Sequence, residues 1–224
     1  MTRPIVILRP APGGSATAER VRAAGLDPIL LPLFAVAPLD WTPPDPAAFD
    51  ALLLTSANAA RQAGAGLARI AGLPVLAVGP ETADAAAQVG LRVIECGSQG
   101  VAALLARLPG NQRLLWLAGR DRTAVDHPAV RMTIAVYANN AIGWTPEQAA
   151  QLPGTVAMVH SARATRQLAA QLDAHRIPRA SVRIAAISAR AADADGHGWD
   201  RVALAGEPSD AALIAAAQRL AIDP

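Results

Sequence analysis

Short apolar runs of strand length alternate along the chain with longer, alanine-rich segments whose apolar residues recur at helical spacing. This alternation is typical of βα units built around a parallel sheet. The predicted helices include 15–25, 98–108 and 209–221, and Ser209 is placed to cap the last of them. The predicted strands are 4–8, 28–33, 51–54, 74–78, 92–95, 113–117, 134–137, 155–159, 182–187 and 201–205.

Three strand–turn–helix blocks occur twice in the same order. The first pair is offset by 105 positions and the other two by 109, so one connection has grown between them. Ordered self-similarity of this kind predicts two copies of one α/β domain. The paired blocks are TSANAARQ (55–62) with HSARATRQ (160–167), AVGPETADA (77–85) with AISARAADA (186–194), and VIECGSQGVAALL (93–105) with VALAGEPSDAALI (202–214).

The two copies do not simply follow one another, because the first strand and helix have no counterpart directly after them. Extended segments near proline-rich stretches bracket the middle of the chain and predict a nested arrangement. The sequence therefore predicts an α/β fold of two similar parallel-sheet, flavodoxin-like domains joined by a two-stranded β linker. The predicted parts are a discontinuous domain of residues 1–34 and 139–224, an inserted domain of residues 40–132, and linker strands at 35–39 and 133–138.

Composition narrows the class of protein. Hydrophobic residues make up 52% of the 224 residues and charged residues 17%, which predicts a folded chain with a sizeable core. Every basic residue is arginine, so mechanisms that need a lysine are excluded. The arginines are scattered and the net charge is only +2, which does not predict binding of nucleic acid.

Cysteine usage and apolar run length bear on the compartment. Cys96 is the single cysteine, which excludes a disulfide framework and a cysteine metal cluster. No apolar run approaches the roughly 20 residues that a membrane span needs, and the first residues lack the long apolar core of a signal peptide. A cytoplasmic protein without membrane contact is expected.

The loop RPAPGGSA (9–16) has two interpretations. Gly13 and Gly14 before a helix resemble a phosphate-binding turn, although the sequence has neither a complete dinucleotide fingerprint nor a P-loop. The simpler interpretation is a tight βα turn with Ser15 as the helix N-cap. The four histidines lack metal-ligand spacing and no hydrolase motif occurs, so neither a metal site nor a serine hydrolase is predicted.

The repeated turn places polar residues where two helices begin. Thr55 and Ser56 follow one predicted strand, and His160 and Ser161 follow another. In one interpretation these residues only cap their helices. In the other, the free N–H groups of helix starts at the carboxyl ends of parallel strands bind anions without any lysine.

Arginines and the single tyrosine offer further chemistry. Arg120 and Arg122 in GRDRT follow a strand, and Arg9 holds a similar position near the N-terminus. These arginines grip ligand carboxylates, or Asp121 merely pairs with one of Arg120 and Arg122 on the surface. Tyr137 lies in an extended segment, where a phenol either packs in the interior or donates a proton.

The order of these motifs resembles that of the uroporphyrinogen-III synthase family. The resemblance implies two α/β domains, one of them discontinuous, joined by a two-stranded ladder, with the active site in the cleft between them. The matching stretches, which together span nearly the whole chain, are RP (9–10), LLLTSANA (52–59), AVGPETA (77–83), LAGRD (117–121), VY (136–137), HSARAT (160–165) and AGEPSDAAL (205–213).

The resemblance also implies a reaction. Such enzymes cyclise linear hydroxymethylbilane to uroporphyrinogen III, with loss of water and inversion of ring D, without a metal or organic cofactor. Tyr137 matches the tyrosine that is proposed to assist departure of the hydroxyl group. The expected partners are this polycarboxylate substrate and, transiently, the upstream bilane-forming enzyme, with the protein itself a monomer. The substrate-binding positions implied by the resemblance are Arg9, Thr55, Ser56, Asn58, Thr82, Arg120, Ser161 and Ser188.

Departures from the family pattern keep another hypothesis open. VYANN lacks the basic residue that commonly follows the family tyrosine, and His160 stands where the family has threonine or a small residue. Ser188 and Ala191 replace a glycine and a threonine of the family motif. The alternative hypothesis is a non-catalytic, two-domain small-molecule-binding or regulatory protein, in the form of an inactive paralogue.

Overall fold

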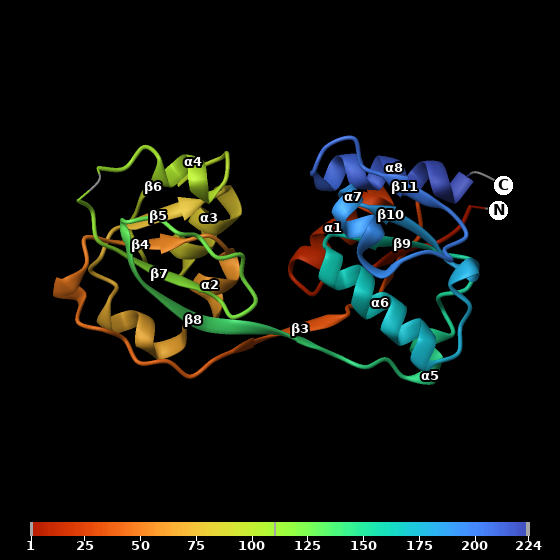
Figure 1. The fold of residues 1–224 in the computed structure, drawn as a ribbon, viewed down its shortest axis with the longest axis horizontal. Coiled ribbons are helices and arrows are strands. Elements are labelled where there is room, and N and C mark those ends of the chain that lie inside the picture. Colours follow the sequence, from red (N-terminus) through yellow and green to blue (C-terminus); the bar gives the residue numbers. More distant parts are fainter. Residues whose placement is uncertain (1, 110, 223–224) are drawn as a thin grey trace. The chain divides into compact units, whose positions relative to one another are not determined.

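The computed structural model describes residues 2–109 and 111–222. The chain divides into two compact units, each built around a sheet (Figure 1). The discontinuous unit comprises the residues up to Ala35 and those from Ala141 onward, and the inserted unit comprises Val36–Asn140. Among the described residues, no helix combines the length and the apolar character needed to cross a bilayer.

The discontinuous unit contains a parallel sheet whose central strands are completely buried. Near-continuous apolar runs form these strands because both faces of the sheet are covered. The described elements of this unit are β1 (Ile5–Ile7), α1 (Gly13–Ala23), β2 (Pro28–Leu30), α5 (Pro146–Ala149), β9 (Val156–Val159), α6 (Ala162–Ala174), η3 (Arg179–Ser181), β10 (Arg183–Ala186), α7 (Ala189–Ala192), η4 (Asp193–Asp195), β11 (Val202–Leu204) and α8 (Asp210–Ile222).

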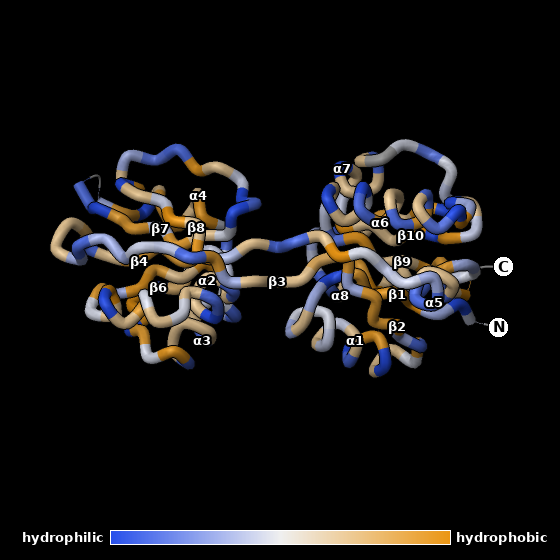
Figure 2. Tube along the Cα trace, turned by 90° about the horizontal axis from the view of Figure 1, so that it is seen from below, coloured by the Kyte–Doolittle hydropathy of each residue, from blue (hydrophilic) through white to orange (hydrophobic). Residues whose placement is uncertain are grey.

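The strand order in this sheet is β11-β10-β9-β1-β2, and all of the pairings are parallel. In chain order this is the flavodoxin-like arrangement. Helices α1 and α8 supply the apolar residues of one layer of core, and α5, α6 and α7 supply those of the other. Figure 2 shows the hydrophobic positions gathered in the strands between these helices.

The inserted unit is built in the same way around a second sheet. Its core also has two layers, and alanine side chains allow the helices to lie close to the strands. The described elements are β3 (Phe34–Pro38), η1 (Pro46–Ala48), β4 (Ala51–Leu54), α2 (Ala57–Gln62), η2 (Gly64–Arg69), β5 (Val75–Val78), α3 (Pro80–Gln88), β6 (Val93–Gly97), α4 (Val101–Leu105), β7 (Leu114–Gly119) and β8 (Val130–Ala141), of which β3 and β8 cross the boundary between the units.

The second sheet has the order β3-β8-β7-β4-β5-β6, and the strands from β8 to β6 pair in parallel. Strand β3 runs against β8, as two backbone hydrogen bonds indicate. Leu39 N–H donates to the Val136 carbonyl and Ile142 N–H donates to the Leu33 carbonyl, each at 3.0 Å. Residue numbers of the partners on β8 therefore fall as those on β3 rise, so the two strands are antiparallel.

The two sheets share one spatial order with permuted connections. The sequence repeats make β4, β5 and β6 the counterparts of β9, β10 and β11. Strands β7 and β8 then occupy the places that β1 and β2 occupy in the other sheet. This strand pair comes first in one unit and last in the other, which explains why the first strand and helix have no counterpart directly behind them. The β1–β2 connection contains α1, whereas the β7–β8 connection contains no helix among its described residues.

The predicted fold class is confirmed, since both sheets are parallel apart from the β3 edge and each of the predicted strands overlaps an observed one. The predicted N-cap at Ser15 is wrong. Helix α1 begins at Gly13 with Pro12 as its N-cap, because a proline needs no N–H partner at a helix start, and Ser15 lies inside the first turn. The predicted helix over 98–108 is shortened to α4, which starts only after the positive φ of Gly100. The Ser209 cap is confirmed, since the Ala212 N–H donates to its hydroxyl.

Candidate functional site

Each sheet has one place where the chain connections diverge. In the discontinuous unit β1 leads to β2 on one side, while β9 leads to β10 on the other. In the inserted unit β7 leads to β8, and β4 leads to β5 in the opposite direction. Ligands of open α/β sheets bind outside the carboxyl ends of the strands at this switch point. The two candidate edges are therefore the ends of β1 and β9, and the ends of β4 and β7.

At the β4 end, the repeated turn both caps a helix and contacts the next strand. Ser56 is the N-cap of α2, and its hydroxyl accepts a hydrogen bond from the Asn58 N–H at 3.2 Å. The Thr55 hydroxyl accepts a hydrogen bond from Nε1 of Trp116 on β7, also at 3.2 Å. Thr55, Ser56 and Asn58 remain partly exposed, so this turn carries polar groups at the switch point.

At the β7 end, Arg120 is fixed by its neighbours. Its backbone N–H donates to the Tyr137 carbonyl at 2.8 Å, and its Nη2 donates to Oδ1 of Asn140 at 3.0 Å. Asp121 lies 3.6 Å from Nε of Arg120, so the predicted pairing of these two charges does form. The Arg120 side chain is still half-exposed, which leaves part of the guanidinium open to solvent.

Arg122 does not share this arrangement. Its Nη1 donates to the Gly119 carbonyl at 3.3 Å, and its guanidinium lies over the ring of Trp116 with 5.7 Å between the guanidinium carbon and the ring centroid. The side chain therefore folds back onto its own unit, and of the two arginines in GRDRT only Arg120 reaches towards β8.

Tyr137 lies in the interior of the inserted unit, where the pairing of β8 with β7 ends. Only 7% of the residue is exposed, and its ring belongs to the core layer that β4, α2 and α3 also form. Its hydroxyl has no hydrogen-bond partner within residues 2–109 and 111–222. The packing interpretation is therefore confirmed for the ring, while proton donation by the phenol stays a prediction.

At the ends of β1 and β9, several polar side chains contact one acidic residue, which the sequence did not single out as a site residue. Asp210, the first residue of α8, accepts hydrogen bonds from the Thr17 hydroxyl at 3.0 Å and from Nη1 of Arg20 at 2.6 Å. His160 Nε2 lies 3.1 Å from its Oδ1 and Arg9 Nη1 lies 3.9 Å from the same oxygen. One carboxylate thus joins side chains from α1, from the β1–α1 loop and from the β9–α6 turn.

The environment of Asp210 favours its charged form. Burial alone raises the pKa of this carboxyl group, but hydrogen bonds from His160, Arg20 and Thr17 outweigh burial and hold the pKa far below its usual range. Asp210 is therefore an anion at neutral pH. It partly neutralises the cations at this edge, including Arg9.

His160 and Ser161 do not form a catalytic pair. The Ser161 hydroxyl accepts a hydrogen bond from the Ala164 N–H at 3.2 Å as the N-cap of α6, while the His160 ring turns to Asp210. Nδ1 of His160 is buried and lacks a hydrogen-bond partner in the described part of the chain. This turn is the counterpart of Thr55-Ser56 and is likewise capped by a serine, although Ser161 binds the N–H three residues on and Ser56 the N–H two residues on.

The path of Arg9 depends on two glycines at the start of α1. A Cβ atom added to Gly13 would lie 2.7 Å from Nη2 of Arg9, and one added to Gly14 would clash with the Arg9 carbonyl oxygen. The two glycines therefore let the first turn of α1 pass close beneath Arg9, and this close approach accounts for GG in the loop without any phosphate.

The two remaining predicted positions lie after neighbouring strands, away from the switch points. Ser188 follows β10 and is the N-cap of α7, where its hydroxyl accepts a hydrogen bond from the Ala191 N–H at 3.3 Å. Thr82 follows β5 in the first turn of α3 and is only 4% exposed. The structure thus gathers Thr55, Ser56, Asn58, Arg120 and Tyr137 at one edge, and gathers Arg9 and Ser161 at the other.

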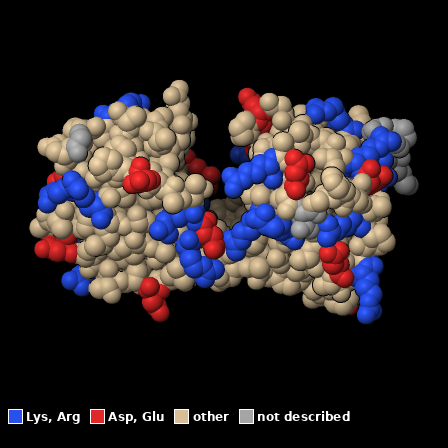
Figure 3. Space-filling view, viewed as in Figure 1, with Lys and Arg blue, Asp and Glu red and all other residues tan. Residues whose placement is uncertain are grey.

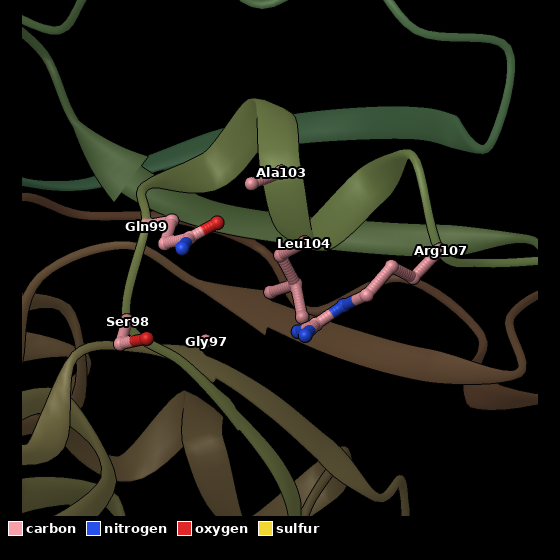
Figure 4. Close-up of a pocket in the computed structure, with 6 residues that line it drawn as sticks. All are labelled: Gly97, Ser98, Gln99, Ala103, Leu104 and Arg107. Carbon is pink, nitrogen blue, oxygen red and sulfur yellow. The ribbon is translucent and has the colours of Figure 1, made fainter.

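A small pocket lies after β6, in neither of these places. Gly97, Ser98, Gln99, Ala103, Leu104 and Arg107 line it, as Figure 4 shows. Its volume of about 160 Å³ is below the several hundred Å³ typical of sites for organic ligands. Arg107 is also paired with Glu95 at 2.8 Å, so this pocket is not a candidate for a large substrate.

Charge and metal-binding chemistry add little beyond the two edges. Figure 3 shows arginines spread over both units on the visible face, with acidic side chains among them. No group of three or more histidine, cysteine or acidic side chains suited to a metal ion occurs among the described residues.

The fold and these edges define a class of protein, the doubly wound α/β proteins that carry ligand-binding groups at the switch points of their sheets. A family model described as uroporphyrinogen-III synthase HemD matches residues 15–215, and the chain belongs to this family. Its members are uroporphyrinogen-III synthases, which act in porphyrin and haem biosynthesis.

Solved structures are similar at low sequence identity. The uroporphyrinogen-III synthetase of Helicobacter pylori 26695 matches with a TM-score of 0.67 at 16% identity, covering 98% of this chain and 100% of that chain. This similarity shows the same fold. The uroporphyrinogen III synthase of Thermus thermophilus matches with a TM-score of 0.42 at 19% identity, covering 98% of this chain and 96% of that chain. No curated protein sequence gives a significant match.

Proposed function

We propose that this protein cyclises linear hydroxymethylbilane to uroporphyrinogen III, with loss of water and inversion of ring D, as a cofactor-independent lyase. The observation that carries the proposal is the family match over residues 15–215. The chemistry needs a proton for the departing hydroxyl group and hydrogen-bond donors for the substrate carboxylates. Tyr137 and the polar groups at the two edges are proposed to supply them.

Tyr137 is the proposed proton donor. Its phenol O–H has no partner in the described part of the chain, its ring is held in the core, and its carbonyl accepts a hydrogen bond from the Arg120 N–H. The proton that Tyr137 donates leaves with the hydroxyl group as water, and the carbon that carried this group becomes part of a delocalised cation. The substrate's own carboxylates stabilise this cation until ring closure.

The proposed carboxylate donors lie at the two edges. Arg120 offers a half-exposed guanidinium, and the Thr55-Ser56 turn offers the first N–H groups of α2. At the other edge Arg9 and the N–H groups at the start of α6, after Ser161, play the same part. Asn58 at the same turn, and Thr82 and Ser188 after the neighbouring strands, are proposed as further substrate-binding residues.

The remaining expectations are also proposals. The protein acts in the cytoplasm as a monomer and does not bind nucleic acid, in keeping with a net charge of +2. It receives its substrate in transient contact with the enzyme that makes the bilane, because bilane that is free in solution closes spontaneously to the symmetric type I isomer.

The decisive experiment measures which isomer forms. Bilane is generated in situ with and without the protein, the products are oxidised, and the porphyrin isomers are separated. We expect the type III isomer to predominate with the protein, and the type I isomer to predominate without it. The Tyr137→Phe variant serves as the matched control and should shift the products towards type I. If the wild-type protein yields type I alone, the proposed function is wrong and the inactive paralogue is the correct alternative.

A further inference from the structure

We propose that Gly119 is a positioning residue for Tyr137. The phenol ring occupies the space that a side chain at position 119 would fill, and this space is called the seat of the ring. This inference rests on the proposed function of Tyr137. The evidence for the seat itself comes from the packing of β7 and β8 within the inserted unit.

Alternation along β7 sets the direction in which residue 119 points. Leu115 and Leu117 belong to the core layer on the side of α2 and α3, whereas Trp116 and Ala118 belong to the layer on the other side. Since successive residues of a strand point to opposite faces, a side chain at position 119 would project into the same layer as Leu115 and Leu117.

A register shift brings Tyr137 into that layer. Ala118 pairs with Ala135, but Gly119 pairs with Tyr137, so β8 carries Val136 as an extra residue at this point. An extra residue turns the following side chain to the opposite face. Val136 and Tyr137 accordingly both lie in the layer that contains Leu117, although they are neighbours in the sequence.

The ring then fills the place above Gly119. A Cβ atom at position 119 would lie 2.7 Å from Cζ of Tyr137, 2.9 Å from its hydroxyl oxygen and 3.0 Å from Cε2. Non-bonded carbon atoms do not approach this closely, so the ring would have to move. The Tyr137 backbone cannot easily follow, because its carbonyl accepts the Arg120 N–H at 2.8 Å.

The requirement for glycine at this position is steric, with no contribution from backbone conformation. Gly119 is not among the glycines with positive φ, so its backbone tolerates alanine. Gly72 offers a matched control in the same unit. Its φ is likewise not positive, and a Cβ there meets no atom within 4 Å.

The first test measures the environment of the Tyr137 ring in the Gly119→Ala variant, without substrate. Tyr137 is the only tyrosine of the chain, so tyrosine labelled with ¹³C at Cζ gives one NMR signal. We expect this signal to shift in Gly119→Ala and to stay in place in Gly72→Ala. An unchanged signal in a folded Gly119→Ala protein would overturn the inference.

The second test measures turnover with bilane. We expect Gly119→Ala to lower kcat by about tenfold with little change in KM, because the proton donor moves while the carboxylate donors stay. In the Tyr137→Phe background the same substitution should lower kcat by less than about twofold. Equal losses in both backgrounds would show that Gly119 acts independently of the phenol.

A folding control covers the case in which Gly119→Ala does not fold. Tyr137→Ala removes the ring, so Gly119→Ala/Tyr137→Ala should fold as Tyr137→Ala does, and a double variant that fails to fold contradicts the seat. The outcomes also separate the two proposals. If Tyr137→Phe turns over at the wild-type rate, the proposed role of the phenol fails, while the NMR signal still decides whether Gly119 seats the ring.

Discussion

The two sheets repeat one spatial order, yet their switch points are electrostatically different. In the discontinuous unit, Asp210 at the start of α8 binds Arg20 and His160 and lies near Arg9. The matching position in the second copy is Val101, the first residue of α4, which offers no charge. One edge is thus built around an internal anion, whereas the other is built around a buried tyrosine.

The difference shows how each edge fixes its arginine. Arg9 passes over a glycine pair towards a carboxylate that partly neutralises it, whereas Arg120 is held by the neutral amide of Asn140 and by the more distant Asp121. A duplicated fold therefore need not keep duplicated chemistry, because the same sheet order accommodates different side chains at the strand ends. If the proposed function is correct, the inserted unit carries the proton donor, and the discontinuous unit contributes only to binding.

Removing the phenol should have the largest effect. We expect Tyr137→Phe to lower kcat by about 10- to 100-fold, since general acid catalysis contributes at least that much. Stability should change by less than about 0.5 kcal/mol, because the hydroxyl has no partner among the described residues. Steady-state kinetics and urea unfolding measure the two quantities. An unchanged kcat would assign the chemistry to another group and remove the contrast between the units.

Removing the internal anion should mainly affect stability. We expect Asp210→Asn to lower the free energy of unfolding by about 2 kcal/mol. An amide has one acceptor oxygen and no charge, so it cannot accept all of the hydrogen bonds that the carboxylate accepts from Arg20, His160 and Thr17. The exposed Asp84 on α3 provides a control, and Asp84→Asn should change stability by less than about 0.5 kcal/mol. Urea unfolding that gives equal values for both variants would refute the structural role of Asp210.

The same carboxylate should make stability depend on acid. Since the pKa of Asp210 is lowered in the folded state, its charge stabilises the fold above the unfolded pKa of about 4. This stabilisation is lost as the pH falls through the folded pKa. The stability difference between the wild type and Asp210→Asn should therefore shrink below about pH 4. A difference that does not shrink in urea unfolding at low pH would contradict this linkage.

The smallest effects are expected at the repeated turns, where the two units are most alike. Ser56→Ala and Ser161→Ala each remove one N-cap and should each cost about 1 kcal/mol. Native-state hydrogen exchange should place each loss in its own unit, and the double variant should be additive. A much larger loss for one serine would mean that other differences between the turns, such as Asn58 against Arg163, also affect the caps.

The parts that could be predicted are those whose signal lies in nearby residues. Apolar runs such as 51–54 and 155–159 predicted strands because a parallel strand covered on both faces needs apolar residues throughout. The TSANAARQ and HSARATRQ turns predicted helix starts because serine caps the N–H groups that follow it. The failure at Ser15 has the same local origin, since Pro12 provided an earlier helix start that the serine pattern concealed.

Patterns along the chain were enough to predict the α/β class, the duplication, the capped turns and the family. The assembled structure was needed to show that β7 and β8 stand in for β1 and β2, that Asp210 binds side chains from α1 and the β9–α6 turn, and that Tyr137 lies above Gly119. Contacts between residues far apart in the sequence leave no local pattern. Asp210 lies 50 positions from His160 and 193 from Thr17, and a one-residue register shift on β8 decides which face Tyr137 occupies. Contacts of this kind appear only when the sheet and its helices are assembled.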